Sequence, residues 1–178
     1  MRHLSVLAAA LLLAVVTRPA AANLVDDCYQ VGPADPDRLI TVCTRAIEAG
    51  GSAKDRSVAY DNRARGYQAK GDFDRALADY NESISLDPRN AYAYDNRGDL
   101  YRENGEYERA ISDYSAAIRV DGTFLSAYLD RGMAYEAMGN LRSARADYQT
   151  VLDSAGRNRE IDRWAKKQAK ARLDELGE

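Results

Sequence analysis

The sequence contains a single histidine, His3, and no phosphate-binding loop. His3 lies in an N-terminal segment that we expect to be removed, so the mature chain has no imidazole to act as a base, a proton shuttle or a metal ligand. No nucleophilic side chain has a base nearby, and paired acids such as Asp26 and Asp27 are too common to indicate a site. The chain therefore lacks the features of an enzyme, and we expect no catalytic residue, no metal site and no cofactor.

Basic residues are in the minority, with 25 Lys and Arg against 28 Asp and Glu and a formal net charge of −3. Loss of Arg2 and Arg18 with the N-terminal segment would take this charge to about −5. Proteins that bind nucleic acid carry a basic stripe or patch. A mildly acidic chain therefore excludes nucleic acid as the expected partner.

Long apolar runs are also absent. The longest, residues 4–16, has thirteen residues, whereas a helix needs about 20 to span a bilayer. It follows a short basic start and precedes the small residues Ala20, Ala21 and Ala22, which is the order of parts in a secretory signal. We predict a signal peptide over residues 1–22, cleaved after Ala22, and a periplasmic or secreted protein with no stable membrane insertion. An N-terminal membrane anchor is the alternative.

The only cysteines are Cys28 and Cys43, both early in the chain. In an exported protein an even pair indicates a disulfide. The spacing is not that of a C-x-x-C motif, and zinc would need more Cys or His ligands than the mature chain has. We predict a structural disulfide between the two, with free thiols as the alternative.

A pattern that recurs every 34 residues dominates the rest of the chain. The string YDNRA at residues 60–64 returns as YDNRG at 94–98 and, altered, as YLDRG at 128–132. A fixed period of this length indicates stacked units that cannot bury their apolar face alone. Such a scaffold is typical of binding rather than of catalysis.

Turn residues divide each unit into two helices. Gly71, Gly105 and Gly139 separate the helices within the units, and Asp87-Pro88 and Asp121-Gly122 close the first two units. We therefore predict helices over residues 57–70, 73–86, 91–104, 107–120, 125–138 and 141–154, and no strands.

These positions resemble the tetratricopeptide repeat (TPR) family, whose helix–turn–helix units carry a large residue, a small residue and Tyr in the first helix, then Ala, an aromatic residue and Pro in the second. The matching residues are Tyr60, Ala64, Tyr67, Tyr94, Gly98, Tyr101, Tyr128, Gly132 and Tyr135 in first helices, and Ala76, Tyr80, Ala110, Tyr114, Ala144 and Tyr148 in second helices. The resemblance implies an all-α fold, a right-handed superhelical solenoid, with units at 57–90, 91–124 and 125–158. The chain departs from the family in that only Pro88 fills the terminal Pro position.

The segments at both ends of the repeats are interpreted as caps. Residues 36–49 imitate the second helix of a unit, with Cys43 at the position of Tyr80, so 23–56 is a capping segment with a degenerate half-repeat. We expect the disulfide to pin an irregular segment, residues 23–36, across that helix, because an end repeat lacks a neighbour on one face. Residues 159–178 resemble the C-terminal capping helix of the family. Trp164 is interpreted as the packing anchor of this helix, with a ligand platform as the alternative.

Each unit also carries an arginine in its first helix, where the family usually has Leu, and an aspartate in its second. The arginines are Arg63, Arg97 and Arg131, and the aspartates are Asp79, Asp113 and Asp147. We hypothesise that they form a ladder of ion pairs between neighbouring helices. A solvated charged face is the alternative, and exposed pairs are worth only about 0–1 kcal/mol each.

In TPR proteins the first helices line a concave groove that binds an extended peptide or a helix. Carried over by position, the predicted groove lining is Asp61, Asn62, Arg65, Gln68, Tyr92, Asp95, Asn96, Asp99, Arg102, Leu129, Asp130, Met133 and Glu136. The resemblance implies that Asn62 and Asn96 bond a peptide backbone, since an amide both donates and accepts. The alternative is that these are ordinary exposed helix residues.

The charge of this lining bears on the partner. Family members that clamp a C-terminal carboxylate use Lys and Arg at several groove positions, whereas this chain has Asp61, Asp95 and Asp130 there. We therefore expect an unidentified protein or peptide with a basic or neutral polar segment. The favoured function is an exported, non-catalytic protein–protein interaction scaffold. The alternative is a structural or envelope-associated assembly protein that self-associates through its repeats.

Overall fold

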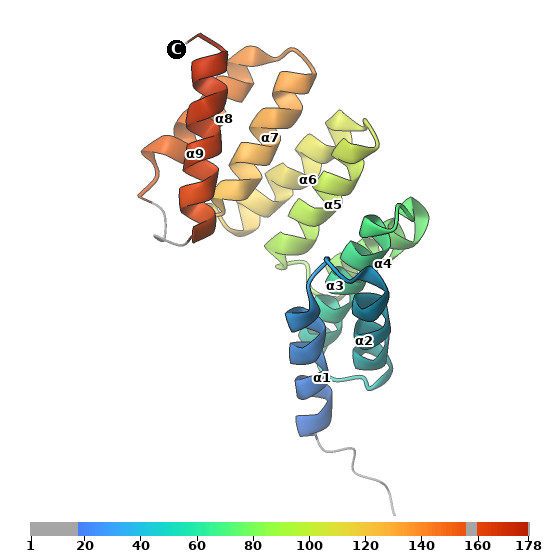
Figure 1. Cartoon of the computed structure of the whole chain (residues 1–178). Helices are drawn as coiled ribbons and strands as arrows, with labels where there is room; N and C mark the ends of the chain where they lie inside the picture. The colour runs from blue at the N-terminus through green and yellow to red at the C-terminus, as the bar shows by residue number, and fades with distance from the viewer. Residues whose placement is uncertain (1–17, 156–159, 178) are drawn as a thin grey trace, which may run out of the picture.

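The computed structural model describes residues 18–155 and 160–177, and these form nine helices and no strand. The helices are α1 (Arg18–Val31), α2 (Pro36–Glu48), α3 (Ala53–Ala69), α4 (Phe73–Leu86), α5 (Ala91–Glu103), α6 (Tyr107–Val120), α7 (Leu125–Ala137), α8 (Leu141–Asp153) and α9 (Glu160–Glu175). Figure 1 shows them stacked one after another, with α9 at the C-terminal end of the stack. The all-α repeat architecture predicted from the 34-residue period is confirmed.

The repeat helices begin and end close to the predicted residues, with one exception. Helix α3 begins at Ala53, four residues before the predicted start. Ser52 Oγ accepts a hydrogen bond from the Asp55 amide at 3.1 Å, and Asp55 Oδ2 accepts one from the Ser52 amide at 3.0 Å. This reciprocal capping box satisfies two amides at the helix start and so extends α3 by about one turn.

The first helices of the units form one layer and the second helices form the other. In the part of the chain that the structure describes, α3 contacts α5 and α5 contacts α7, whereas α4 and α6 do not meet, nor do α6 and α8. A stack that is tight in one layer and open in the other must curve. The concave face is therefore built from α3, α5 and α7, and α9 extends it by packing on α7 and α8.

Small residues let the two helices of a unit approach each other. A Cβ atom added to Gly98 would lie 2.7 Å from Tyr114 Cε1, and one added to Gly132 would lie 2.6 Å from Tyr148 Cε1. Both tyrosine side chains are fully buried. The alternation of small residue and Tyr in the sequence is thus a packing requirement, because the ring occupies the space that a side chain at the glycine would need.

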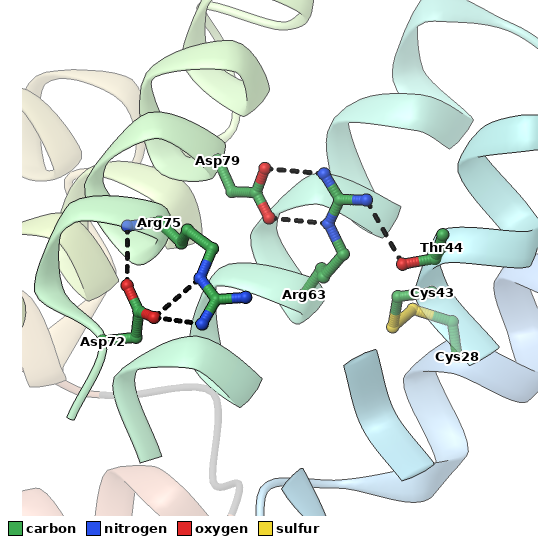
Figure 2. Close-up of polar contacts among 7 residues, drawn as sticks. All are labelled: Cys28, Cys43, Thr44, Arg63, Asp72, Arg75 and Asp79. Atoms are coloured by element: carbon green, nitrogen blue, oxygen red, sulfur yellow. Dashed lines mark hydrogen bonds and ion pairs between the residues drawn. A yellow bond between two sulfur atoms is a disulfide. The ribbon is translucent and has the colours of Figure 1, made fainter. Parts of the chain in front are cut away.

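The arginine–aspartate ladder is present in all three units. In each, the arginine donates through Nε and Nη2 to the two carboxylate oxygens at 2.7–2.8 Å, and Figure 2 shows the first of these pairs, Arg63–Asp79. The arginine side chains are 18–20% exposed and the aspartate side chains 8–9%. A solvated charged face is therefore the wrong interpretation, because these bidentate pairs lie between packed helices.

Each arginine also reaches back to the preceding unit. Arg97 Nη1 donates to Asn81 Oδ1 at 2.6 Å, and Arg131 Nη1 donates to Ser115 Oγ at 3.0 Å. Arg63 makes the equivalent bond to Thr44 Oγ1 of α2 at 3.2 Å (Figure 2). Helix α2 thus occupies the place of a second helix, as its sequence indicated.

The segment before α2 differs from the prediction. Residues 23–31 belong to helix α1 and are not irregular, so α1 and α2 form a helical hairpin. The disulfide between Cys28 and Cys43 joins the two helices, and both cysteines are fully buried (Figure 2). Val25, Leu39 and Ala59 pack around it, so the bridge lies in a core shared with α3.

Helix α9 covers the last unit, but not through its tryptophan. Ala165, Ala169 and Leu173 of α9 pack into a core with Leu125 and Tyr148. Trp164 is 47% exposed and lies outside this core. The interpretation of Trp164 as a packing anchor is therefore wrong.

The predicted signal peptide falls mostly on residues 1–17, which lie outside the described residues. Within the ranges that the structure describes, no helix combines the length and the apolar character needed to cross a bilayer.

Candidate functional site

Two cavities on the concave face contain most of the predicted lining residues. The N-terminal cavity, of about 1030 Å³, is lined by residues of α3 and α5 that include Asp61, Asn62, Arg65 and Asn96. The C-terminal cavity, of about 440 Å³, is lined by residues of α5, α7 and α9 that include Asp95, Asp99, Arg102, Asp130, Met133 and Trp164. Tyr92 lines both, so the two cavities adjoin along the inner helices.

In the N-terminal cavity the predicted groove asparagines are bonded within the protein. Asn62 is 2% exposed; its amide donates to the Val58 carbonyl at 2.9 Å and accepts from Arg65 Nη1 at 3.0 Å. Asn96 Nδ2 donates to Asp61 Oδ1 at 3.0 Å, which joins α5 to α3. Asn62 therefore forms part of the cavity floor, and Asn96 ties two units together. The Asn62 amide therefore already has a partner for its donor and for its acceptor, whereas Asn96 is bonded through Nδ2.

The C-terminal cavity gathers aspartates from two neighbouring units. Asp95 and Asp99 come from α5 and Asp130 from α7. Arg102 and Arg172 also line the cavity. Arg102 bonds other residues there: Nη2 donates to Asp99 Oδ1 at 3.0 Å and Nε donates to the Tyr114 hydroxyl at 3.2 Å. Asp95 and Asp130 are thus left without a basic partner among the hydrogen bonds of the cavity.

Aromatic rings border this group of acids. The rings of Tyr92 and Phe124 lie 4.9 Å apart, centre to centre, and are tilted by 60°. Tyr92 is 55% exposed although it is held in place by this contact. Trp164 of α9 faces the same cavity. The rim therefore offers apolar and aromatic surface beside carboxylates.

Burial shifts the acids of the concave face toward their protonated forms. It raises the pKa of Asp95 well above its usual range, with a further rise from Asp130, Asp99 and Asp61. The pKa of Asp130 is raised to about 8, mainly by burial. The charge of Asp99 raises this pKa further, and the charge of Arg102 lowers it. The pKa of Asp61 rises less, to about 6, because burial is opposed by the hydrogen bond from Asn96 and the charge of Arg65.

The sign of these shifts has a consequence for stability. A carboxyl group whose folded pKa exceeds its unfolded value binds a proton more tightly in the fold. Its contribution is therefore most favourable below pH 4 and is lost as the pH rises toward the folded pKa. Burial of these acids on the concave face therefore works against folding at neutral pH.

A repeated position on the first helices receives the hydroxyls of the buried tyrosines. Tyr80 donates to Gln68 Oε1 at 2.7 Å and Tyr148 donates to Glu136 Oε2 at 2.7 Å. In the middle unit the hydroxyl of Tyr114 instead donates to Asp99 Oδ1 at 2.8 Å and accepts from Arg102. Gln68 and Glu136 therefore serve packing, and Arg102 is fixed in the cavity wall.

Most of the predicted lining lies on the concave face, but Leu129 does not. Its side chain is fully buried in the core with Tyr148 and Val151, so its assignment to the groove is wrong. Leu129 occupies the repeat position of Asp61 and Asp95, which is buried in all three units, and here the side chain is apolar and joins the core. The sequence interpretation missed Phe124 and Arg172 as cavity residues, together with Lys54 and Arg89 in the N-terminal cavity.

The acids of the site do not form a metal centre. Among the described residues, no group of three or more His, Cys, Asp and Glu side chains is arranged to hold a metal ion.

Comparison with protein families places the repeats among known ones. A family model described as "TPR repeat" matches residues 65–101 and 98–139, and another described as "Tetratricopeptide repeat" matches residues 125–158. Together these matches span the three units from the middle of α3 onward. No curated protein matches the chain significantly.

Solved structures give the same likeness. The chain is 33% identical to the second TPR of Spaghetti (RPAP3) bound to the HSP90 peptide SRMEEVD, over 56% of this chain and 92% of that one, with a TM-score of 0.54. It is 30% identical to the second TPR domain of human RPAP3 in complex with the HSP70 peptide SGPTIEEVD, over 68% and 95%, with a TM-score of 0.59. MamA, at 20% identity over 89% and 81% and a TM-score of 0.63, shares the fold alone.

Proposed function

Because this chain belongs to the tetratricopeptide repeat family, we propose that it is a non-catalytic interaction scaffold that binds an extended peptide or protein segment on its concave face. The observation that carries the proposal is the run of two adjoining cavities along α3, α5, α7 and α9, with Tyr92 between them. An ordered aromatic side chain that is 55% exposed is a common anchor for a partner.

The two RPAP3 domains support a peptide as the class of ligand. Both are bound to short peptides, and this chain covers nearly all of each domain. Both of those peptides end in the acidic sequence EEVD. In this chain the acids of the C-terminal cavity would repel such a sequence, so the partner segment is basic or neutral polar where it crosses that cavity.

The two cavities differ in charge, which gives the partner segment a direction. Lys54, Arg65 and Arg89 line the N-terminal cavity beside its acids. In the C-terminal cavity the balance shifts toward the aspartates. A segment with its basic part over the C-terminal cavity therefore complements the surface better than the reverse orientation.

Replacing Tyr92 tests the function. Peptides selected from a random library on the wild-type protein are titrated by fluorescence polarisation against Tyr92→Ser and against Met138→Ser, which removes an exposed apolar side chain that lines neither cavity. We expect Tyr92→Ser to weaken binding about tenfold or more, equivalent to about 1.4 kcal/mol, with little change in melting temperature, and Met138→Ser to bind as the wild type does. Equal affinities for all three proteins, or selection of mainly acidic peptides, would contradict the proposal.

The proposed setting is outside the cytoplasm. The support is the signal-like order of residues 1–22, and an oxidising compartment suits the Cys28–Cys43 disulfide. Cleavage after Ala22 would remove the first turn of α1 and leave Cys28 in place. N-terminal sequencing of protein recovered from the periplasm or the medium is expected to begin at Asn23, and recovery of a chain that keeps residues 1–22 would argue for an anchor instead.

A further inference from the structure

One carboxylate oxygen in the C-terminal cavity is buried without a partner. Asp95 is 7% exposed, and its Oδ1 atom has no hydrogen-bond partner. Asp95 lines the cavity, so the residue that carries the unpartnered oxygen forms part of the cavity wall. Buried polar atoms in folded proteins nearly always have a partner, and an acceptor that lacks one marks a place where a donor from outside would fit.

The repeat explains why this donor is missing. In the preceding pair of units, Asp61 Oδ1 accepts its hydrogen bond from Asn96, which lies 35 residues further along the chain. The residue in the same relation to Asp95 is Asp130, an acid that in its ionised form donates nothing. One change of side chain thus turns a satisfied Asp–Asn pair into two facing acids at a single junction of the scaffold.

The surroundings of these two acids suit an organic cation. Asp99 adds a third carboxylate, and the adjacent Arg102 donates to Asp99 and to the Tyr114 hydroxyl and not to Asp95 Oδ1. The rings of Tyr92, Phe124 and Trp164 line the same cavity. Cations are attracted to the faces of aromatic rings as well as to carboxylates. A cavity of about 440 Å³ leaves room for a side chain rather than a large ligand.

From these contacts we infer that the C-terminal cavity binds a cationic side chain, the ammonium of a lysine or the guanidinium of an arginine, carried by the partner segment. This inference rests on the proposed function, since the groove must hold the segment that carries the cation. The cationic group donates to the carboxyl groups of Asp95 and Asp130, and its aliphatic stem lies against the aromatic rim. A bare metal ion is a poorer occupant, because no group of three acids in the described residues is arranged to hold one.

Binding of a cation at this place is coupled to protons. The pKa values of Asp95 and Asp130 are raised by burial, so the empty cavity binds protons more tightly than free carboxyl groups do. The charged groups that face them are Asp61, Asp99 and Arg102, with Arg172 on α9. Since a neutral carboxyl group attracts a cation weakly, affinity is expected to increase as the pH rises from 6 to 9.

The chain's only tryptophan makes the test direct, because Trp164 lines the cavity. The purified protein is titrated with capped Gly/Ser heptapeptides that carry one central lysine, arginine, norleucine or glutamate, and Trp164 fluorescence is followed. We expect saturable responses to the lysine and arginine peptides at concentrations at least tenfold lower than for norleucine or glutamate. The Asp95→Asn protein should need about tenfold more lysine peptide and should show a smaller pH dependence, with Asp130 left to titrate.

Matched variants separate recognition from folding. Asp95→Asn is a neutral isostere, and it should melt at or above the wild-type temperature at pH 7.5 because a buried acid is removed. Glu82→Gln removes the same charge from an exposed position on α4 and should bind as the wild type does. Asp130→Asn is the second cavity variant, and it should weaken the lysine peptide in the same way.

The outcomes distinguish this inference from the proposed function. Equal responses to lysine and norleucine peptides, unchanged binding in Asp95→Asn, or no saturable response at all would overturn the cationic site. A library peptide that binds the wild type, fails on Tyr92→Ser and is indifferent to Asp95→Asn would leave the scaffold function standing without it. Loss of peptide binding in Tyr92→Ser together with a preserved lysine response would leave the cationic site standing.

Discussion

Replacing Asp113 by alanine is expected to lower the free energy of unfolding by about 3 kcal/mol. The change leaves the Arg97 guanidinium between α4, α5 and α6 with only its bond to Asn81 and its contacts with the rings of Tyr94 and Tyr101. Removing one partner of a buried ion pair destabilises the fold by more than the intact pair stabilises it, because the remaining charge stays desolvated. The expected loss lies at the low end of the usual range because the Arg97 side chain is 19% exposed to solvent, which partly screens its charge.

Two controls make the Asp113 measurement specific. Ser112→Ala, at an exposed position on the same helix, should change stability by less than about 0.5 kcal/mol. Removing both partners in Arg97→Met with Asp113→Leu should restore much of the loss, because no unpaired charge remains. Urea unfolding followed by circular dichroism measures all three. If Asp113→Ala unfolds like the double variant, the ion pair does not hold the helices together.

Replacing both cysteines, Cys28→Ser with Cys43→Ser, is expected to release α1 from the rest of the stack. The bridge closes a separation of 15 residues, and a loop of that length is worth about 3 kcal/mol in the chain-entropy model. Two buried hydroxyls replace the sulfurs in the core formed with Val25 and Leu39, which adds to the loss. Among the described residues, the leading hairpin packs against α3 alone, so it has few other contacts to compensate for the loss.

Hydrogen exchange locates the effect of the cysteine change. Amides of α1 should lose most of their protection in the double serine variant, while amides of α5 to α8 should keep theirs, because distant units interact only through their neighbours. The melting temperature should fall, and peptides that bind the concave face should still bind. The wild-type protein treated with reductant provides the matched comparison. A variant that melts and exchanges like the wild type would show that the bridge is dispensable.

The repeat helices could be predicted from the sequence because residues at each helix end determine where the helix stops. Gly71, Gly105 and Gly139 stop the first helices, and all three adopt the positive φ that favours glycine. The ion-pair ladder could also be predicted, since a fixed period carries a contact in one unit to the same place in the next. Both the helix ends and the ion pairs are determined by residues within one unit, and these residues recur in the other units.

Helix α1 was missed because it carries no copy of the repeat. Its own signal was present: Leu24, Val25, Cys28 and Val31 have helical spacing and pack against the hairpin core, and Gly32-Pro33 ends the helix. Comparison with the 34-residue repeat does not identify such a segment as helical. The sequence reading of 23–36 therefore relied on similarity where periodicity was the better guide.

The candidate site was predictable in outline and not in its decisive detail. Counting from the repeats placed Asp95, Asp99 and Asp130 on the concave face correctly, but the same count placed Leu129 there, although its apolar side chain is in the core. The unpartnered oxygen of Asp95 depends on which atoms two neighbouring helices bring together. The repeat spacing does not show that Asn96 bonds Asp61. The presence of Asp130 at the position of Asn96 in the next unit therefore could not be interpreted from the sequence.

The arginine ladder has a consequence for how such a chain can change its length. Arg97 and Arg131 each bond a residue 16 positions behind and another 16 positions ahead. Because these separations are the same at both junctions, one whole unit could be inserted or removed there and every guanidinium would again meet an acid. The facing pair Asp95 and Asp130 exists at one junction alone. The number of units and the chemistry of recognition can therefore change independently.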